Sequence, residues 1–180
     1  MSKRLLLIFL SFFLYCNIVI AENSKIVYVD VDRIINQSTA GINLSKQIKN
    51  INSKNASKFK KREQELIEIE NRIIKKKNVL SKDDFEKQAK ALNNDVANFK
   101  QEINKSRKVL TQKKLEATTK ILNVLNSILS EYSSKNSISL IIQKKNIVIG
   151  KSELDITKPI LDLVNAKIKS VKLNWCLKIL

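Results

Sequence analysis

Residues 82–117 read KDDFEKQAKALNNDVANFKQEINKSRKVLTQKKLEA, a stretch without Gly or Pro. Mostly apolar residues recur in it at alternating steps of four and three, at Phe85, Ala89, Leu92, Val96, Phe99, Ile103, Ser106, Leu110, Lys113 and Ala117. This spacing places one narrow apolar stripe along a helix, as in a coiled coil. The stripe predicts a long helix that packs against a second helix and leaves most of its surface in water.

The second helix is predicted just before the first, over residues 40–77, where there is no Pro and a single Gly. Its seam is thin, with apolar residues at Leu44, Ile48 and Ile51, and then at seven-residue steps at Phe59, Leu66, Ile73 and Leu80. Ser81 is a good N-cap, and Asp84 three residues later completes a capping-box arrangement. The two helices therefore form an antiparallel hairpin that turns near residues 81–84. Because the stripe is thin, we expect an arm that flexes.

Both ends of the chain predict β-structure around this hairpin. Residues 25–31 alternate as a strand, a short helical turn follows to Ser38, and residues 137–143 and 147–150 are typical of a β-hairpin. Residues 155–157 then cap a terminal helix with Pro159 in its first turn. The expected fold is mainly α with a small β part (α+β), a helical arm projecting from a small β-sheet body. One inward face of that body, where an oligomer would assemble, is assigned to Val27, Val29, Leu140, Ile142 and Val148.

Composition limits the function. The chain has 34 Lys and Arg against 17 Asp and Glu, a net charge of +17, so its partners are acidic: nucleic acid, anionic lipid or acidic polypeptide. It has no His, which removes the commonest general base and transition-metal ligand. Asp30, Asp32 and Asp155 lack the spacing of a metal loop and are assigned to turns and caps. We therefore expect no enzyme activity, no metal and no cofactor.

The first 21 residues have the features of a secretory signal. Lys3 and Arg4 precede an apolar run, and small residues stand before a cleavage site after Ala21. Removing this segment leaves 32 basic and 17 acidic residues, a net of +15. Only Cys176 of the two cysteines then remains, so no internal disulfide can form. A retained membrane anchor and a lipoprotein at Cys16 are the alternatives, and Tyr15 is too bulky for a usual lipobox.

Several segments, in this order, resemble the Skp/OmpH family of periplasmic chaperones: residues 26–30 with Arg33, Ile34 and Ser38, the charged hairpin, residues 140–143 and 147–149, and residues 154–157. The resemblance covers the mature chain to about Lys169. It implies a homotrimer whose strands build a β body and whose three arms surround a client cavity. It also implies ATP-independent holding, in the periplasm, of unfolded outer-membrane β-barrel proteins.

The resulting division is a signal segment (1–21), a chaperone domain (22–170) with its body at 22–45 and 118–170 and its arm at 46–117, and a tail (171–180). The tail, with Trp175 and Cys176, has no assigned role. Residues 52–110 hold 16 basic and 9 acidic residues, a net of +7. The candidate client- or anion-binding residues are its basic clusters, at Lys58, Lys60, Lys61, Arg62, Arg72, Lys75, Lys76, Lys77, Lys105, Arg107 and Lys108.

Two less specific interpretations stand beside this one. Any single lysine is more simply the solvated face of a long helix, and Phe59, Phe85 and Phe99 at heptad positions are more simply seam than client contacts. The functional signal is the charge of the whole arm, which would also attract lipopolysaccharide or an anionic membrane surface. The alternative functions are an anchored coiled-coil envelope spacer and a basic protein that binds nucleic acid without sequence specificity. The N-terminus of the mature protein separates these functions. A retained segment from Met1 would favour the spacer, and a mature protein that starts at Glu22 would favour the exported chaperone.

Overall fold

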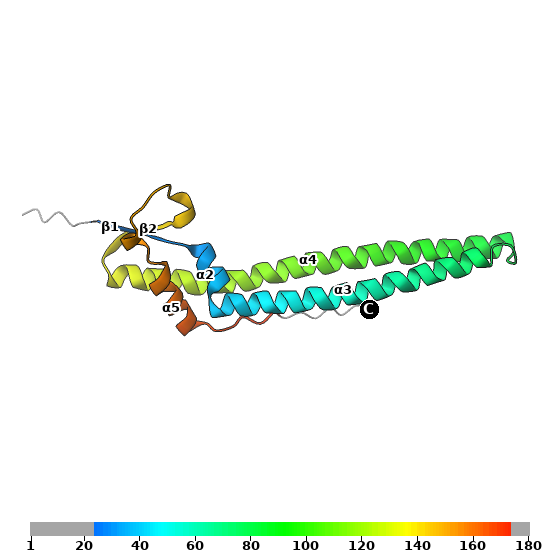
Figure 1. Ribbon diagram of the computed structural model, residues 1–180, viewed down its shortest axis with the longest axis horizontal. Helices are drawn as coiled ribbons and strands as arrows, with labels where there is room; N and C mark the ends of the chain where they lie inside the picture. Colours follow the sequence, from blue (N-terminus) through cyan, green and yellow to red (C-terminus); the bar gives the residue numbers. More distant parts are fainter. Residues whose placement is uncertain (1–23, 174–180) are drawn as a thin grey trace, which may run out of the picture.

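The computed structural model describes residues 24–173, so the expected signal segment and residues 174–180 lie outside it. The chain forms, in order, β1 (Lys25–Val29), α2 (Val31–Gln37), α3 (Thr39–Lys75), α4 (Lys82–Lys135), β2 (Ile138–Gln143), the 3₁₀ turns η1 (Lys144–Asn146) and η2 (Ser152–Leu154), and α5 (Thr157–Lys167). Figure 1 shows α3 and α4 side by side as one long arm, with the other elements gathered at one end. The mainly helical fold with a small β part is therefore confirmed.

The arm is held by the predicted seam. Its helices have 37 and 54 residues, so they are about 56 and about 81 Å long at 1.5 Å per residue. Every predicted stripe residue of both helices is buried or half-buried, while the positions between them are mostly exposed. The buried members are few, at Leu44, Leu66, Ile73, Ser106, Leu110 and Ala117. A narrow row of contacts therefore holds most of the arm.

Side-chain caps fix where these helices begin. The Ser81 hydroxyl accepts a hydrogen bond from the backbone N–H of Asp84, 3.1 Å away, as the capping box predicted. Ser38 caps α3 in the same way through the N–H of Gly41, and Asp30 caps α2 through the N–H of Arg33. Each cap satisfies an N–H that the first turn of a helix leaves without a partner.

The sheet differs from the prediction. β1 and β2 pair in parallel, and the expected second strand at 147–150 does not form. The chain turns out of the sheet at η1, and the other edge of β1 is taken by an isolated bridge from Tyr28 to Asp155. The N–H of Ile156 completes that bridge by donating to the Tyr28 carbonyl at 2.9 Å. Residues 147–150 therefore have strand-like side chains but pair with no strand among residues 24–173.

The residues expected on one inward face divide between the two faces of the sheet in this chain, and their role in assembly stays a prediction. Val27 and Val29 are buried in the body, but Leu140 and Ile142 pair with Ile26 and Tyr28 and so lie on the opposite face of the sheet. Leu140 is half exposed, and Val148 is fully exposed. A parallel register with an irregularity near Ile26 causes the change, because it brings Ile138 and Ile141 to the core side instead.

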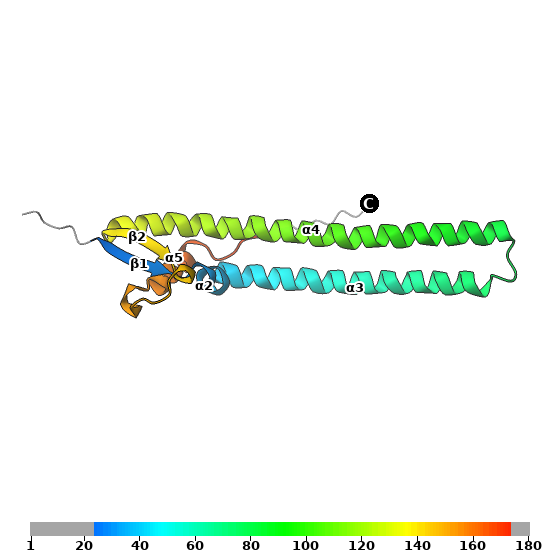
Figure 2. The same ribbon diagram turned by 90° about the horizontal axis from the view of Figure 1, so that it is seen from above.

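The body core joins the sheet to three helices. It contains Val27, Val29, Ile34, Leu125, Ile128, Ile138, Ile156, Ile160 and Val164. Since α4 is longer than α3, its last turns run past the start of α3 and supply the platform on which β1 and α5 pack (Figures 1 and 2). Among residues 24–173, no helix has the length and apolarity needed to cross a membrane.

The start of α5 depends on Asp155. Its carboxylate accepts hydrogen bonds from the Thr157 N–H at 2.9 Å and from the Lys144 ammonium at 3.0 Å. Partial burial alone would raise the pKa of Asp155, but these bonds outweigh it, and the pKa lies below its usual value. The hydrogen bond and charge of Asp155 raise the pKa of Lys144. Asp155 thus fixes the turn that leads into α5, whose N-cap residue is Ile156.

A first prediction concerns the close approach of α2 and α3 at Gly41. A Cβ at this position would collide with the Ile35 carbonyl, whereas at Gly150 it would meet side-chain atoms, at 3.1 Å from the Tyr28 ring and 3.5 Å from Ile147. In an open helix, Gly→Ala is stabilising. Here Gly41→Ala should lower the free energy of unfolding by about 1–3 kcal/mol, the usual cost of overpacking. Urea unfolding followed by circular dichroism measures it, with Gly150→Ala as the control. A gain in stability at Gly41 would contradict the packing.

A second prediction concerns pH. A carboxylate whose folded pKa is lowered stabilises the fold above its unfolded pKa, and the contribution is lost as the pH falls through the folded pKa. Stability should therefore fall on acidification below about pH 4, the ordinary Asp range. Asp155→Asn keeps an acceptor for Thr157 but loses the ion pair, so its stability should fall less steeply in that window. Unfolding curves between pH 2 and pH 7 test this, and parallel profiles for both proteins would rule Asp155 out as a cause.

Candidate functional site

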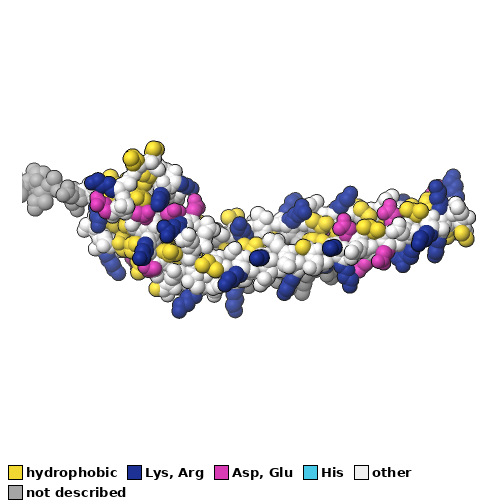
Figure 3. All heavy atoms as spheres, viewed as in Figure 1, with side chains coloured by type: hydrophobic (Ala, Val, Ile, Leu, Met, Phe, Trp, Pro, Cys, Tyr) yellow, Lys and Arg dark blue, Asp and Glu magenta, His cyan; other side chains and the backbone are white. Residues whose placement is uncertain are grey.

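The arm surface carries the predicted basic clusters. Figure 3 shows Lys and Arg side chains projecting along the length of the arm, with acidic side chains between some of them. All of the candidate cations are exposed except Arg62, which is half-buried. The cluster of Arg72 and residues 75–77 lies at the tip, where α3 ends and the chain turns toward α4. The structure thus leaves nearly all of these residues open to solvent.

The other two clusters meet in the middle of the arm. Asn55 donates a hydrogen bond to the Ser106 hydroxyl at 3.1 Å, and the Lys58 ammonium contacts the Glu102 carboxylate at 2.7 Å. The basic residues of 58–62 on α3 and of 105–108 on α4 therefore lie on neighbouring turns of facing helices. The tip cluster is separate from them, further along α3.

Few of these cations are paired. Among the described residues, Lys58 pairs with Glu102 and Arg62 with Glu65, whereas the candidates at the tip and on α4 form no ion pair. An unpaired exposed ammonium or guanidinium keeps its charge available to a passing anion. Two of the seven candidates in the middle of the arm are therefore neutralised, while all four candidates at the tip keep an unpaired charge.

Shallow grooves follow the seam between the helices. One of about 300 Å³ is lined by Asn52, Asn55, Ala56, Phe59, Ile103, Ser106, Arg107 and Leu110. A second, of about 370 Å³ near the tip, is lined by Ile69, Arg72, Ile73, Lys76, Gln88, Ala91, Leu92 and Asp95. Phe59 and Phe99 pack edge to face across the seam, with ring centroids 6.1 Å apart. These two rings, and the half-buried Phe85, are seam residues with one edge in water.

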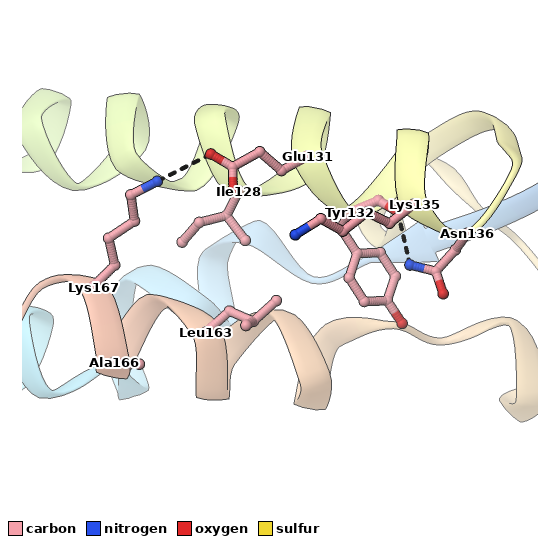
Figure 4. Close-up of a pocket in the computed structure, with 8 residues that line it drawn as sticks. All are labelled: Ile128, Glu131, Tyr132, Lys135, Asn136, Leu163, Ala166 and Lys167. Atoms are coloured by element: carbon pink, nitrogen blue, oxygen red, sulfur yellow. Dashed lines mark hydrogen bonds and ion pairs between the residues drawn. The ribbon is translucent and has the colours of Figure 1, made fainter.

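A pocket of about 640 Å³ opens between the end of α4 and α5 in the body. Figure 4 shows Ile128, Tyr132 and Leu163 in it, with Lys167 reaching across to Glu131. The Lys167 ammonium lies 3.2 Å from the Glu131 carboxylate and, through that hydrogen bond, lowers the pKa of Glu131. Sequence reasoning missed this pocket because its two walls come from α4 and α5, and no pattern in the sequence indicates that these two helices lie side by side.

The body also exposes apolar side chains. Ile26 and Leu140 on the outer face of the sheet are about half exposed, and Val148 and Ile149 in the loop between η1 and η2 are almost fully exposed. Figure 3 shows apolar atoms at the surface of this part of the body. Apolar groups gathered in this way mark surfaces that contact other proteins.

No metal centre is evident in the part of the chain that the structure describes. Residues 24–173 contain no group of three or more His, Cys, Asp or Glu placed to hold an ion. Asp30 and Asp155 instead accept hydrogen bonds from backbone N–H groups. What the arrangement offers is extended charge and shallow grooves lined by both apolar and polar side chains.

Comparisons with known proteins agree with this architecture. A crystal structure of a proposed outer membrane chaperone (OmpH-like) from Caulobacter crescentus CB15 has a TM-score of 0.77 and 16% sequence identity, over 83% of this chain and 88% of that one. At this identity the likeness concerns the fold. A comparison with curated proteins found no match. The model of the family described as "Outer membrane protein (OmpH-like)" matches residues 25–164, which is more than half of the chain, and the chain therefore belongs to the OmpH-like family.

Proposed function

We propose that this protein is a periplasmic holding chaperone that binds unfolded outer-membrane proteins without ATP. The observation that carries the proposal is the arm of an OmpH-like chain: long, joined by a thin seam, with a net charge of +7 over residues 52–110 and most candidate cations unpaired. Holding a client requires no catalytic group, which suits a chain without His.

Binding would rest on many weak contacts. An exposed charge pair contributes only about 0–1 kcal/mol, and salt screens it over about 8 Å at physiological ionic strength. Several basic arms around one cavity raise the effective concentration of such contacts, so that their sum holds a client that no single contact could hold. A client that folds into a membrane barrel withdraws its surface from all of the contacts together. Release therefore needs no nucleotide.

Assembly into a homotrimer is part of the proposal, and the number three comes from the family resemblance. A two-stranded sheet is marginal alone, and the outer edge of β2 has no partner strand among the described residues. Exposed apolar side chains lie next to this edge. Ile26 and Leu140 are on the outer face of the sheet, and Val148 and Ile149 are in the loop that follows it. Closure with neighbouring subunits would cover both the edge and the apolar groups.

A third prediction tests the charge at the tip. Reversing Lys75, Lys76 and Lys77 together to Glu should weaken capture of an acidic unfolded porin about tenfold, since three exposed pairs of up to about 1 kcal/mol are lost. Capture should also become less sensitive to salt. Any single reversal should have little effect. Fluorescence titration of a urea-unfolded porin across a salt series measures both quantities.

The matched control reverses three exposed lysines of the body, Lys135, Lys145 and Lys158, which changes the net charge equally. This variant should retain capture if the arm is the binding surface. Equal capture by the tip variant and the parent at every salt concentration would show that the tip charge serves only solvation.

A fourth prediction separates body from arm. Replacing residues 52–110 by a short loop should leave the oligomer intact while abolishing capture. Val148→Asp with Ile149→Asp should instead release monomers with an unchanged helix content, because it places charge in the apolar loop of the body. Light scattering gives the masses. A monomeric arm-less protein, or an unaffected loop variant, would place assembly elsewhere in the chain.

A further inference from the structure

Residues 168–173 form an extended segment, called the strap here, that follows α5. The family match ends at residue 164, so the strap lies beyond it. Figures 1 and 2 show the strap leaving α5 and running toward the arm, beside the first turns of α3. At its start, Ile168 has extended backbone angles of −140° and 120°. The first residues of the tail, for which the sequence suggested no role, thus have a defined position against the arm.

The strap is held mainly through its backbone. Asn43 donates its side-chain N–H to the Lys169 carbonyl at 2.9 Å. Gln47 donates to the Val171 carbonyl and accepts from the Leu173 N–H, both at 2.9 Å. One side-chain amide therefore pairs with a C=O and an N–H two residues apart, as the backbone of a neighbouring strand would. Every polypeptide carries these two groups at this spacing.

The distance between successive turns of α3 matches the distance between alternate residues of the strap. Asn43 and Gln47 are one turn apart on α3, about 6 Å along the axis at 1.5 Å per residue. Two residues of extended chain span about 6.6 Å. The two amides therefore meet carbonyls that are two residues apart, at Lys169 and Val171. The register requires an extended chain and would not fit a helix.

Side chains of the strap alternate between buried and exposed positions. Val171 is 5% exposed and fills a hollow between the two long helices, against Ala40, Leu44, Ala117 and Ile121. Leu173 packs at the edge of the same cluster, while Lys172 between them is exposed. Strands of outer-membrane barrels show the same pattern, apolar on one side and polar on the other. The groove thus accepts a chain with the pattern of such a strand.

We propose that the groove beside Asn43 and Gln47 is a binding site for an extended, alternating polypeptide segment, and that the strap is its resident occupant. A strand-like segment of an unfolded barrel would compete with the strap for the groove. That the competitor is such a segment rests on the proposed chaperone function, whereas the site itself rests on the contacts of the strap. The basic arm would then capture a client by charge, and the groove at its root would bind extended backbone.

The test uses the mature full chain and a fluorescein-labelled peptide, KIKSVKL, which is the sequence of residues 167–173. Val171→Asp should unseat the strap, because a carboxylate does not fit the apolar hollow. Peptide binding measured by anisotropy should be at least about tenfold tighter than with the parent, whose groove is filled. Adding Gln47→Leu, which keeps the bulk and loses both hydrogen bonds, should remove the gain. Equal binding by the two variants, or no gain over the parent, would overturn the site.

Two further measurements keep the test decisive. If Val171→Asp loses helix content, Val171→Ala replaces it, since it empties the hollow without adding a charge. Hydrogen exchange at the Leu173 amide should be faster in the Gln47→Leu variant than in the parent. Unchanged exchange would show that Gln47 does not hold the strap, and would overturn the site without any peptide.

A second peptide tests the competitor. A barrel-strand peptide with alternating apolar residues should displace KIKSVKL from the Val171→Asp variant, and a shuffled peptide of equal composition should not. Equal displacement by both would overturn the preference for alternating segments. The two proposals fail separately. Capture of a whole porin without binding of either peptide would contradict the groove proposal and leave the holding function intact. Peptide binding without porin capture would contradict the holding function and leave the groove intact.

Discussion

The narrowness of the seam between α3 and α4 is the constraint on which the rest of the structure depends. A stripe of one residue in three or four can hold two helices together, but it buries few side chains completely along the arm. The remaining surface must be polar to stay in water, and here much of it is Lys and Arg. The narrow seam therefore leaves the arm thinly held and requires a polar surface, which in this chain is mainly basic.

The body anchors this long hairpin at one end. The last turns of α4 pass beyond α3 and pack with β1, β2 and α5 around Ile34, Leu125 and Ile160, all of which are buried. Caps at Asp30 and Ser38, and the turn held by Asp155, then fix the corners where the chain changes direction. The exposed edge and loop of this small body, at Leu140 and Val148, are what a neighbouring subunit would cover.

Sequence patterns predicted the elements whose stability is local. The heptad-like steps from Phe85 to Ala117 predicted the seam, and Ser81 predicted the turn, because periodicity and capping act over a few residues. Strand pairing depends on residues far apart in the sequence, so the β-branched residues at 147–149 suggested a strand that finds no partner in the part of the chain that the structure describes. The strap was missed for the same reason: nothing near residue 171 indicates that Gln47, far away in the chain, holds its backbone. The body pocket likewise joins helices that no sequence pattern relates.

Charge on the arm, exposed apolar groups on the body and a groove for extended backbone all suit one task, the holding of an unfolded barrel protein by an assembly of arms. The most direct measurement is the mass of the mature protein in light scattering, alone and with one urea-unfolded porin. A holding trimer predicts a mass of three chains that rises by one porin, without added nucleotide. A monomer whose mass does not change when the porin is added would contradict both the assembly and the chaperone function.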